Sequence, residues 1–150
     1  MSVIFNLSEE DAFLYFNLAL LNLRRDIAML GFLHKCNLPD AHPHMLQLFP
    51  KVGFQVGGNH TKQLGHIMAL HRGELFQFEL LKRSVLHLVH VYNALPQYVV
   101  NARSVRDFQA VLTKVARQMV QRHLAQWKTF LAAREWEFQN QEEWKTFFHV

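Results

Sequence analysis

The stretch "VYNALPQYVVNARSVRDF" (residues 91–108) constrains the fold most, because it ends one apolar helical segment and begins another. Pro96 disfavours the helical conformation at the residue before it, so a helix is expected to end at about Leu95. Ser104, with Asp107 three residues on, resembles a capping box, with Asp in place of the usual Glu or Gln. We therefore expect a new helix after Ser104 and a reversal of the chain between the two helices.

The residues between these helices are expected to pack against both of them. Tyr98, Val99 and Val100 are predicted to form an extended bridge. If the bridge folds the two apolar helix faces together, five residues should be buried in one place: Leu95, Val99, Val100, Phe108 and Leu112.

Both flanking segments have helical periodicity. From Glu74, apolar residues recur every three or four positions, which predicts a helix over 74–95. The second segment predicts the longest helix of the chain, over 105–134. Its apolar stripe consists of Val105, Phe108, Val111, Leu112, Val115, Met119, Val120, Leu124, Trp127 and Leu131.

The rest of the chain predicts a single domain, 1–150, of the all-α class with about four helices. Ser8 before three acidic residues is typical of a helix start, and the apolar spacing extends this first helix over 8–36. Prolines bracket a short helix over 43–49. The glycine-rich residues 50–73 predict a long loop or a small hairpin, and 135–150 form an acidic and aromatic tail.

Composition narrows the class of protein. At 150 residues, 50% hydrophobic and 19% charged, the chain can bury a real core. Some of its thirteen Phe and three Trp are candidates for contacts that only an assembly covers. The single cysteine, Cys36, excludes an internal disulfide framework and is expected to be a small buried apolar residue.

The N-terminal residues do not predict targeting or membrane insertion. Acidic residues precede the first apolar run, which is the wrong order for a secretory signal, and the Arg and Ser richness of a transit peptide is missing. Residues 12–23 are interrupted by Asn17 and Asn22 and are shorter than the ~20 apolar residues of a membrane span. We expect no membrane span, and we assign no compartment beyond an intracellular one.

The opposite face of the predicted helix over 105–134 is basic. From Arg103 to Arg134 there are seven Lys or Arg against one acid, Asp107, which leaves a local charge of +6, whereas the whole chain carries +4. Such a face can neutralise phosphates, or it can simply keep an amphipathic helix solvated. If it binds nucleic acid, the candidate residues are Arg103, Arg106, Lys114, Arg117, Arg122 and Lys128.

The sequence offers no catalytic or metal-binding constellation. Glu9, Glu10 and Asp11 are consecutive and so point in different directions on a helix. The pairs His42 with His44 and His87 with His90 have ligand-like spacing, but zinc usually takes three or four ligands. We expect packing or surface histidines, no cofactor, no metal, no small-molecule substrate and no enzyme activity.

Three segments of the sequence, which we call words, resemble a known family. They are "NLRRDIAMLGFLHKCNL" (22–38), "HTKQL" (60–64) and "SVLHLVHVYNALPQYVVNARSVRDFQAVL" (84–112). In order and spacing they are similar to the region after the reverse transcriptase domain in polyproteins of non-LTR (LINE-type) retrotransposons, with wording closest to dinoflagellate copies. The likeness covers about residues 8 to 115. The family's arginine-rich lead-in to the histidine word is replaced here by Gly57, Gly58 and Asn59.

The resemblance implies descent from an RNA-directed DNA polymerase polyprotein, but the clustered carboxylates that hold catalytic metals in such enzymes are missing from this chain. Two functional hypotheses follow. The first is a non-catalytic C-terminal segment of the polyprotein that associates with RNA or an RNA/DNA hybrid. The alternative is a retroelement-derived helical interaction or structural subunit that docks through its aromatic helices onto a larger protein assembly.

Overall fold

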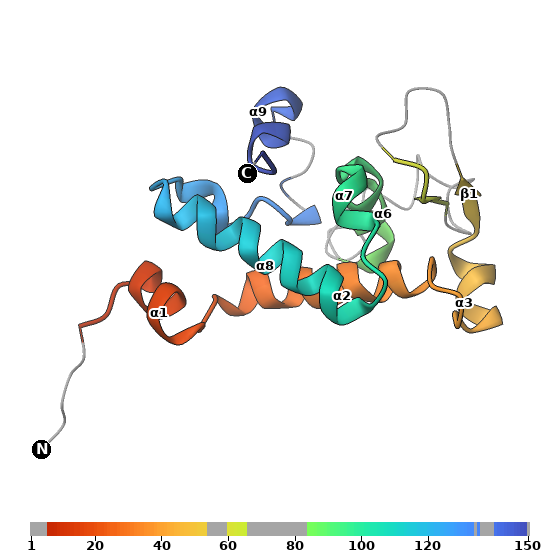
Figure 1. Cartoon of the computed structure of the whole chain (residues 1–150), viewed down its shortest axis with the longest axis horizontal. Coiled ribbons are helices and arrows are strands. Elements are labelled where there is room, and N and C mark those ends of the chain that lie inside the picture. The colour runs from red at the N-terminus through yellow and green to blue at the C-terminus, as the bar shows by residue number, and fades with distance from the viewer. Residues whose placement is uncertain (1–5, 54–59, 66–83, 134, 136–139, 150) are drawn as a thin grey trace, which may run out of the picture.

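The computed structural model describes residues 6–53, 60–65, 84–133, 135 and 140–149, and the described part is mostly helical (Figure 1). Within it lie seven α-helices, α1 (Glu9–Phe16), α2 (Leu21–Lys35), α3 (Pro43–Leu48), α6 (Val85–Ala94), α7 (Gln97–Val100), α8 (Val105–Gln121) and α9 (Gln141–Thr146). A 3-10 helix, η2 (Ala125–Lys128), follows α8. Strands β1 (Lys51–Gly53) and β2 (Gln63–Leu64) pair antiparallel, so the described fold has a small sheet beside its helices.

Two of the expected helix starts are confirmed in atomic detail. The Ser8 hydroxyl oxygen accepts the backbone N–H of Asp11 at 3.1 Å, and α1 begins at the next residue after Ser8. The Ser104 hydroxyl likewise accepts the N–H of Asp107 at 3.0 Å at the start of α8. The short helix expected over 43–49 is also present, as α3.

The single helix expected over 8–36 is wrong, because Asn17 ends α1. Asn17 is in the left-handed conformation with φ 56°, and its N–H and that of Leu18 donate to Phe13 and Ala12 carbonyls. This arrangement satisfies the last carbonyls of a helix and redirects the chain. A second helix, α2, then begins at Leu21.

The helix expected over 105–134 is also shorter than predicted. It stops at Gln121, and His123 adopts a left-handed conformation with φ 58°. The N–H of Leu124 donates back to the Met119 carbonyl, so the chain turns before η2. The expected basic residues therefore do not share one helix: Arg122 follows the end of α8, and Lys128 lies on the separate element η2.

The joint is a helix rather than an extended bridge. α7 occupies Gln97–Val100, directly after Pro96. Ahead of it, Ser84 is extended and α6 begins at Val85, so the helix expected over 74–95 is shorter; residues 74–83 lie outside the described part. The region 50–73 contains the paired strands β1 and β2. Residues 54–59 and 66–73 of this region lie outside the described part of the chain.

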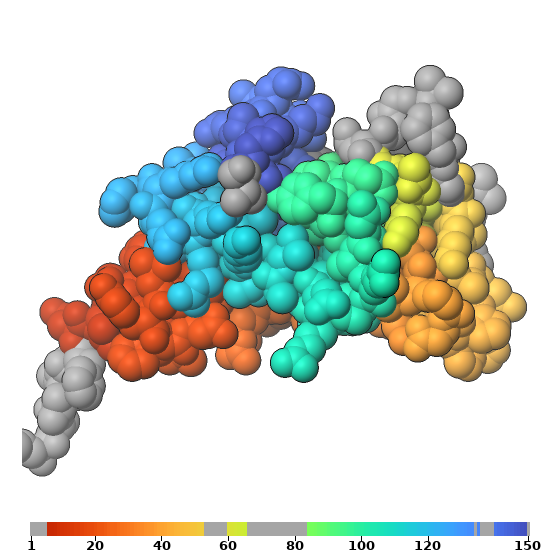
Figure 2. Space-filling view, viewed as in Figure 1, coloured from red at the N-terminus to blue at the C-terminus, as the bar shows by residue number. Residues whose placement is uncertain are grey.

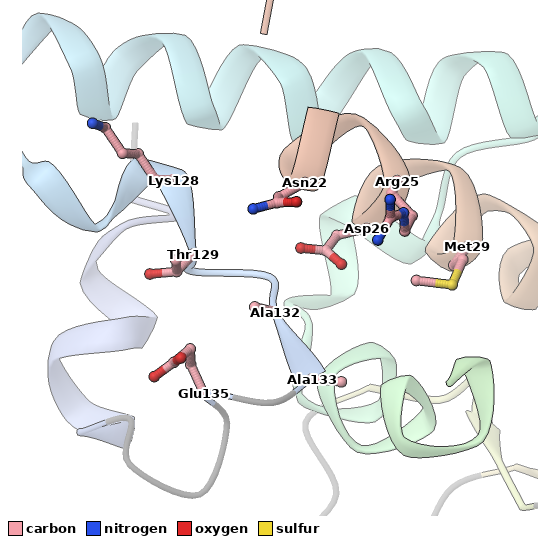
Figure 3. A pocket seen from close by; sticks show the side chains of 9 residues that line it. All are labelled: Asn22, Arg25, Asp26, Met29, Lys128, Thr129, Ala132, Ala133 and Glu135. Atoms are coloured by element: carbon pink, nitrogen blue, oxygen red, sulfur yellow. The ribbon is translucent and has the colours of Figure 1, made fainter. Parts of the chain in front are cut away.

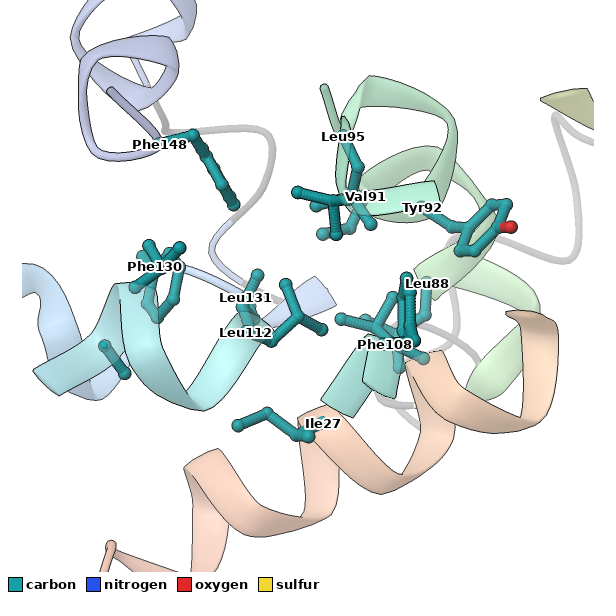
Figure 4. Packing of buried hydrophobic residues seen from close by; sticks show 14 of the residues in the cluster. Ile27, Leu88, Val91, Tyr92, Leu95, Phe108, Leu112, Phe130, Leu131 and Phe148 are labelled. Carbon is teal, nitrogen blue, oxygen red and sulfur yellow. The ribbon is translucent and has the colours of Figure 1, made fainter. Parts of the chain in front are cut away.

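The core forms where α2, α6, α7 and α8 meet (Figure 4). The expectation for five core residues is confirmed, because Leu95, Val99, Val100, Phe108 and Leu112 are all fully buried in one cluster. The expected direct pairing of the two helices around the joint is not the main contact: α6 and α8 both pack chiefly on α2. Gly31 permits the close approach of α2 to α8, because a Cβ there would lie 2.4 Å from Gln109 Nε2 and 3.1 Å from Val105 Cγ1.

The two ends of the molecule carry smaller elements. α1 lies beneath the second half of α8 and packs on it (Figures 1 and 2). The sheet and α3 lie at the opposite end (Figure 1). Among the helices of the described residues, none is long and apolar enough to cross a membrane.

Candidate nucleic-acid interface

A buried polar network joins three distant segments of the chain. Its centre is Tyr92 on α6, whose hydroxyl donates to His34 Nδ1 at 3.0 Å and accepts from the Asn37 amide at 2.9 Å. His34 Nε2–H donates to the Ala102 carbonyl at 2.8 Å, which requires the proton on Nε2 and leaves Nδ1 as the acceptor. Burial lowers the pKa of His34, so the ring is held neutral in this network.

The second buried histidine attaches the strand region to α6. His60 Nε2–H donates to the Tyr92 carbonyl at 2.9 Å, and His60 Nδ1 accepts the N–H of Lys62 at 3.0 Å. Burial also lowers the pKa of His60. The Asn93 side chain pairs with Leu64 like a neighbouring strand: its Oδ1 accepts the Leu64 N–H at 2.9 Å and its Nδ2 donates to the Leu64 carbonyl at 2.8 Å.

This network uses residues from all three of the sequence words described above. His34 and Asn37 come from the first word, His60 and Leu64 from the second, and Tyr92 and Asn93 from the third. Their polar groups are used in binding one another, so they have a structural role. A ligand site must therefore be sought on the outer surface.

Of the two histidine pairs with ligand-like spacing, one lies at the start of α3 and the other lies within α6. His42 Nδ1 accepts the N–H of His44 at 3.2 Å, so His42 caps the N-terminus of α3. The rings of His87 and His90 meet edge to face at 5.4 Å on α6. Within the described part of the chain, no group of three His, Cys, Asp or Glu side chains is placed to hold a metal ion.

Three of the six predicted nucleic-acid residues bind other parts of the protein. Arg117 donates to the carbonyls of Phe13 (3.2 Å) and Leu14 (2.7 Å) and lies over the Phe13 ring. Arg122 donates to the His149 carbonyl at 3.1 Å. Lys128 forms an ion pair with Glu9, which raises the pKa of its ammonium group.

The other three predicted residues, Arg103, Arg106 and Lys114, are exposed to solvent. Arg106, Lys114 and Arg117 line one hollow along α8, whereas Arg103, Arg122 and Lys128 lie outside it. Arg24 of α2 lines a second hollow that shares Asn17, Gln109 and Thr113 with the first. The prediction did not include Arg24, although the "RR" pair of the first word contains it.

We call these two adjoining hollows the basic groove. It consists of Phe13, Asn17, Leu18, Ala19, Arg24, Ile27, Ala28, Arg106, Gln109, Ala110, Thr113, Lys114, Arg117, Gln118 and Gln121. Four of these described residues are cationic and none is a carboxylate. Amide and hydroxyl groups lie between the charges, and such groups commonly contact nucleic-acid phosphates and sugars.

A separate pocket of about 200 Å³ has a lining of mixed charge, with Arg25 and Lys128 beside Asp26 and Glu135 (Figure 3). Asn22 and Asp26 point into it from α2, and Lys128, Thr129 and Glu135 line it from the segment after α8. Burial raises the pKa of the Asp26 carboxyl to about 7, while the nearby Arg25 lowers it. Because its two carboxylates offset its two cations, this pocket suits a polyanion less well than the basic groove does.

We expect the Asp26→Asn variant to be more stable than the native chain above about pH 7. The neutral amide avoids the cost of a partly buried carboxylate. A raised folded-state pKa stabilises the protonated native state, and that stabilisation is lost as pH rises from the unfolded value of 3.8 to about 7. The difference between the two proteins should therefore grow from about pH 4 to 7 and then level off.

Urea unfolding at a series of pH values measures this difference. The variant retains every histidine, so contributions from His34 and His60 cancel. A difference that stays constant from pH 4 to 8 would contradict the assignment of Asp26.

No family model, curated protein or solved structure matches the chain.

Proposed function

We propose that the chain is a non-catalytic, nucleic-acid-associated segment of a retrotransposon reverse-transcriptase polyprotein, and that it binds RNA or an RNA/DNA hybrid. The observation that carries the proposal is the basic groove, whose described lining holds four cationic residues and no carboxylate. Phosphate binding to Lys and Arg releases condensed counterions, which makes affinity depend strongly on salt. A groove without carboxylates avoids repelling the phosphates.

The retroelement origin rests on the three sequence words. The segments that contain them lie far apart in the chain, and the structure joins them through His34, His60 and Tyr92. A shared fold explains why such words would be kept together in order and spacing. The proposed partner follows from the parent polyprotein, which copies an RNA template into DNA.

Charge reversal tests this function. The double variant Arg106→Glu with Lys114→Glu should bind RNA about tenfold or more weakly than the native chain at about 0.1 M salt, because two of the four groove cations become anions. The control is Lys51→Glu with Lys145→Glu, which changes the net charge equally at exposed positions outside the groove. Fluorescence anisotropy of a labelled RNA measures both affinities.

We expect the control to lose affinity by only a small factor. Equal losses in the two double variants would indicate a response to total charge and would contradict a site in the groove. Absence of RNA binding by the native chain would remove the proposal altogether.

A second candidate function is docking onto a protein, as a helical subunit of a larger assembly. The specific observation in its favour is a group of large apolar side chains exposed on and after α1, including Tyr15 and Phe16. Exposed apolar groups that cluster mark interaction sites more often than scattered ones do.

A further inference from the structure

The turn between α1 and α2 exposes four large apolar side chains, which we call the apolar elbow. Tyr15, Phe16, Leu18 and Leu21 are 76%, 60%, 60% and 67% exposed. Their neighbour Phe13 is fully buried and stacks on Trp127 at 5.3 Å. The elbow therefore extends outward from a firmly packed helix.

The elbow borders the basic groove. Asn17 lies between two elbow residues in sequence and lines both hollows, and Leu18 lines one of them. Arg117 fixes this arrangement, because its guanidinium donates to the carbonyls at the end of α1 and to Asn17 Oδ1 at 3.3 Å. The helix that carries the two exposed rings is thus fastened by its C-terminal end to one side of the basic groove.

We propose that this combined surface binds a single-stranded nucleic acid, with unpaired bases stacked on Tyr15 and Phe16 and phosphates in the basic groove. This inference rests on the proposed function and adds the strand state of the ligand. Single-strand sites combine a positive groove with aromatic side chains on which bases stack. A duplex keeps its base faces covered and gains little from the elbow.

A protein partner fits the elbow less well. Its four large apolar side chains make a small apolar centre for a stable protein interface, which takes about 20–30 residues of all kinds from each side. The adjoining groove also favours a polyanion, since Arg24, Arg106 and Lys114 line it and no described lining residue is acidic; the acids of the first turn of α1 lie outside that lining.

The test measures anisotropy of a labelled single-stranded RNA of about twelve nucleotides, and of the same RNA paired with its complement. The variant is Tyr15→Leu with Phe16→Leu, which removes both rings but keeps apolar side chains. We expect the single strand to bind about tenfold or more weakly to this variant than to the native chain, with the duplex affinity unchanged. The duplex measurement also reports whether the groove is still folded.

The matched control is Leu48→Ala, which removes an exposed apolar side chain on α3, at the other end of the molecule (Figure 1). It should bind both RNAs like the native chain. Sedimentation of the native chain and the elbow variant shows whether the elbow mediates self-association instead.

The outcomes separate the two proposals. If the elbow variant binds the single strand as tightly as the native chain does, the base-stacking inference is overturned, while a loss on charge reversal at Arg106 and Lys114 still supports the groove. If the elbow variant changes only self-association, the elbow is a protein contact and the inference also fails. If the native chain binds neither RNA, both proposals fail.

Discussion

Replacing Phe108 with Ala should lower the free energy of unfolding by about 3–5 kcal/mol, the range for deleting a fully buried aromatic ring. Phe108 is completely buried and stacks face to face on His34, with ring centres 4.3 Å apart and planes within 5°. It also contacts Tyr92 at 5.9 Å (Figure 4). The ring thus joins α8 to both α2 and α6, and its loss leaves a cavity where three helices meet.

Reversible urea unfolding measures this loss. Phe16→Ala is the matched control, because Phe16 is a largely exposed ring on α1. Surface substitutions usually change stability by less than about 0.5 kcal/mol. A loss below about 1 kcal/mol for Phe108→Ala would contradict the packing described here.

Replacing Tyr92 with Phe should cost about 2–4 kcal/mol although it removes a single oxygen atom. Without the hydroxyl, His34 Nδ1 loses its donor and the Asn37 amide loses an acceptor. A buried group such as His34 Nδ1 left without a partner costs about 1–3 kcal/mol, and the half-buried Asn37 amide, which keeps its bond to the Lys62 carbonyl at 3.1 Å, adds a smaller loss. Burial also raises the pKa of Tyr92, so the hydroxyl remains a protonated donor throughout the usual pH range.

Tyr98→Phe provides the control for this substitution. Tyr98 is about half exposed, and its hydroxyl donates to the Phe148 carbonyl at 2.7 Å. Water can replace that contact, so we expect a loss of about 1 kcal/mol. Equal losses for the two tyrosines would show that the network around Tyr92 contributes no more than an ordinary surface hydrogen bond.

Local chemistry made much of the fold predictable. Ser8 and Ser104 cap helices because their hydroxyls meet free N–H groups nearby in the chain, and Pro96 ends α6 through a clash with its own neighbour. Of the five core residues around the joint, Phe108 and Leu112 follow from helical periodicity, and Leu95, Val99 and Val100 follow from the expected reversal of the chain. These signals act over a few residues, so a single sequence contains them.

The helix breaks at Asn17 and His123 were not predictable in the same way. Asn22 lies in the same apolar region as Asn17 but is inside α2, so residue type alone does not distinguish a left-handed cap from a helical position. The choice depends on packing: Phe13 must meet Trp127, more than a hundred residues away, and α1 has to turn to allow it.

The candidate site was only partly predictable for a related reason. Helical spacing places Arg106, Lys114 and Arg117 on α8, but it does not show that Arg117 binds the end of α1 or that Lys128 binds Glu9. Those partners are about one hundred residues away in sequence. Arg24 joins the groove only because α2 packs on α8.

The salt dependence of RNA binding by the native chain tests the central claim most directly. With the three exposed groove cations, Arg24, Arg106 and Lys114, neutralising phosphates of a single strand, the logarithm of the association constant should fall linearly with the logarithm of salt concentration, with a slope of about −2. A slope near zero, or no binding at low salt, would contradict a nucleic-acid site in the basic groove.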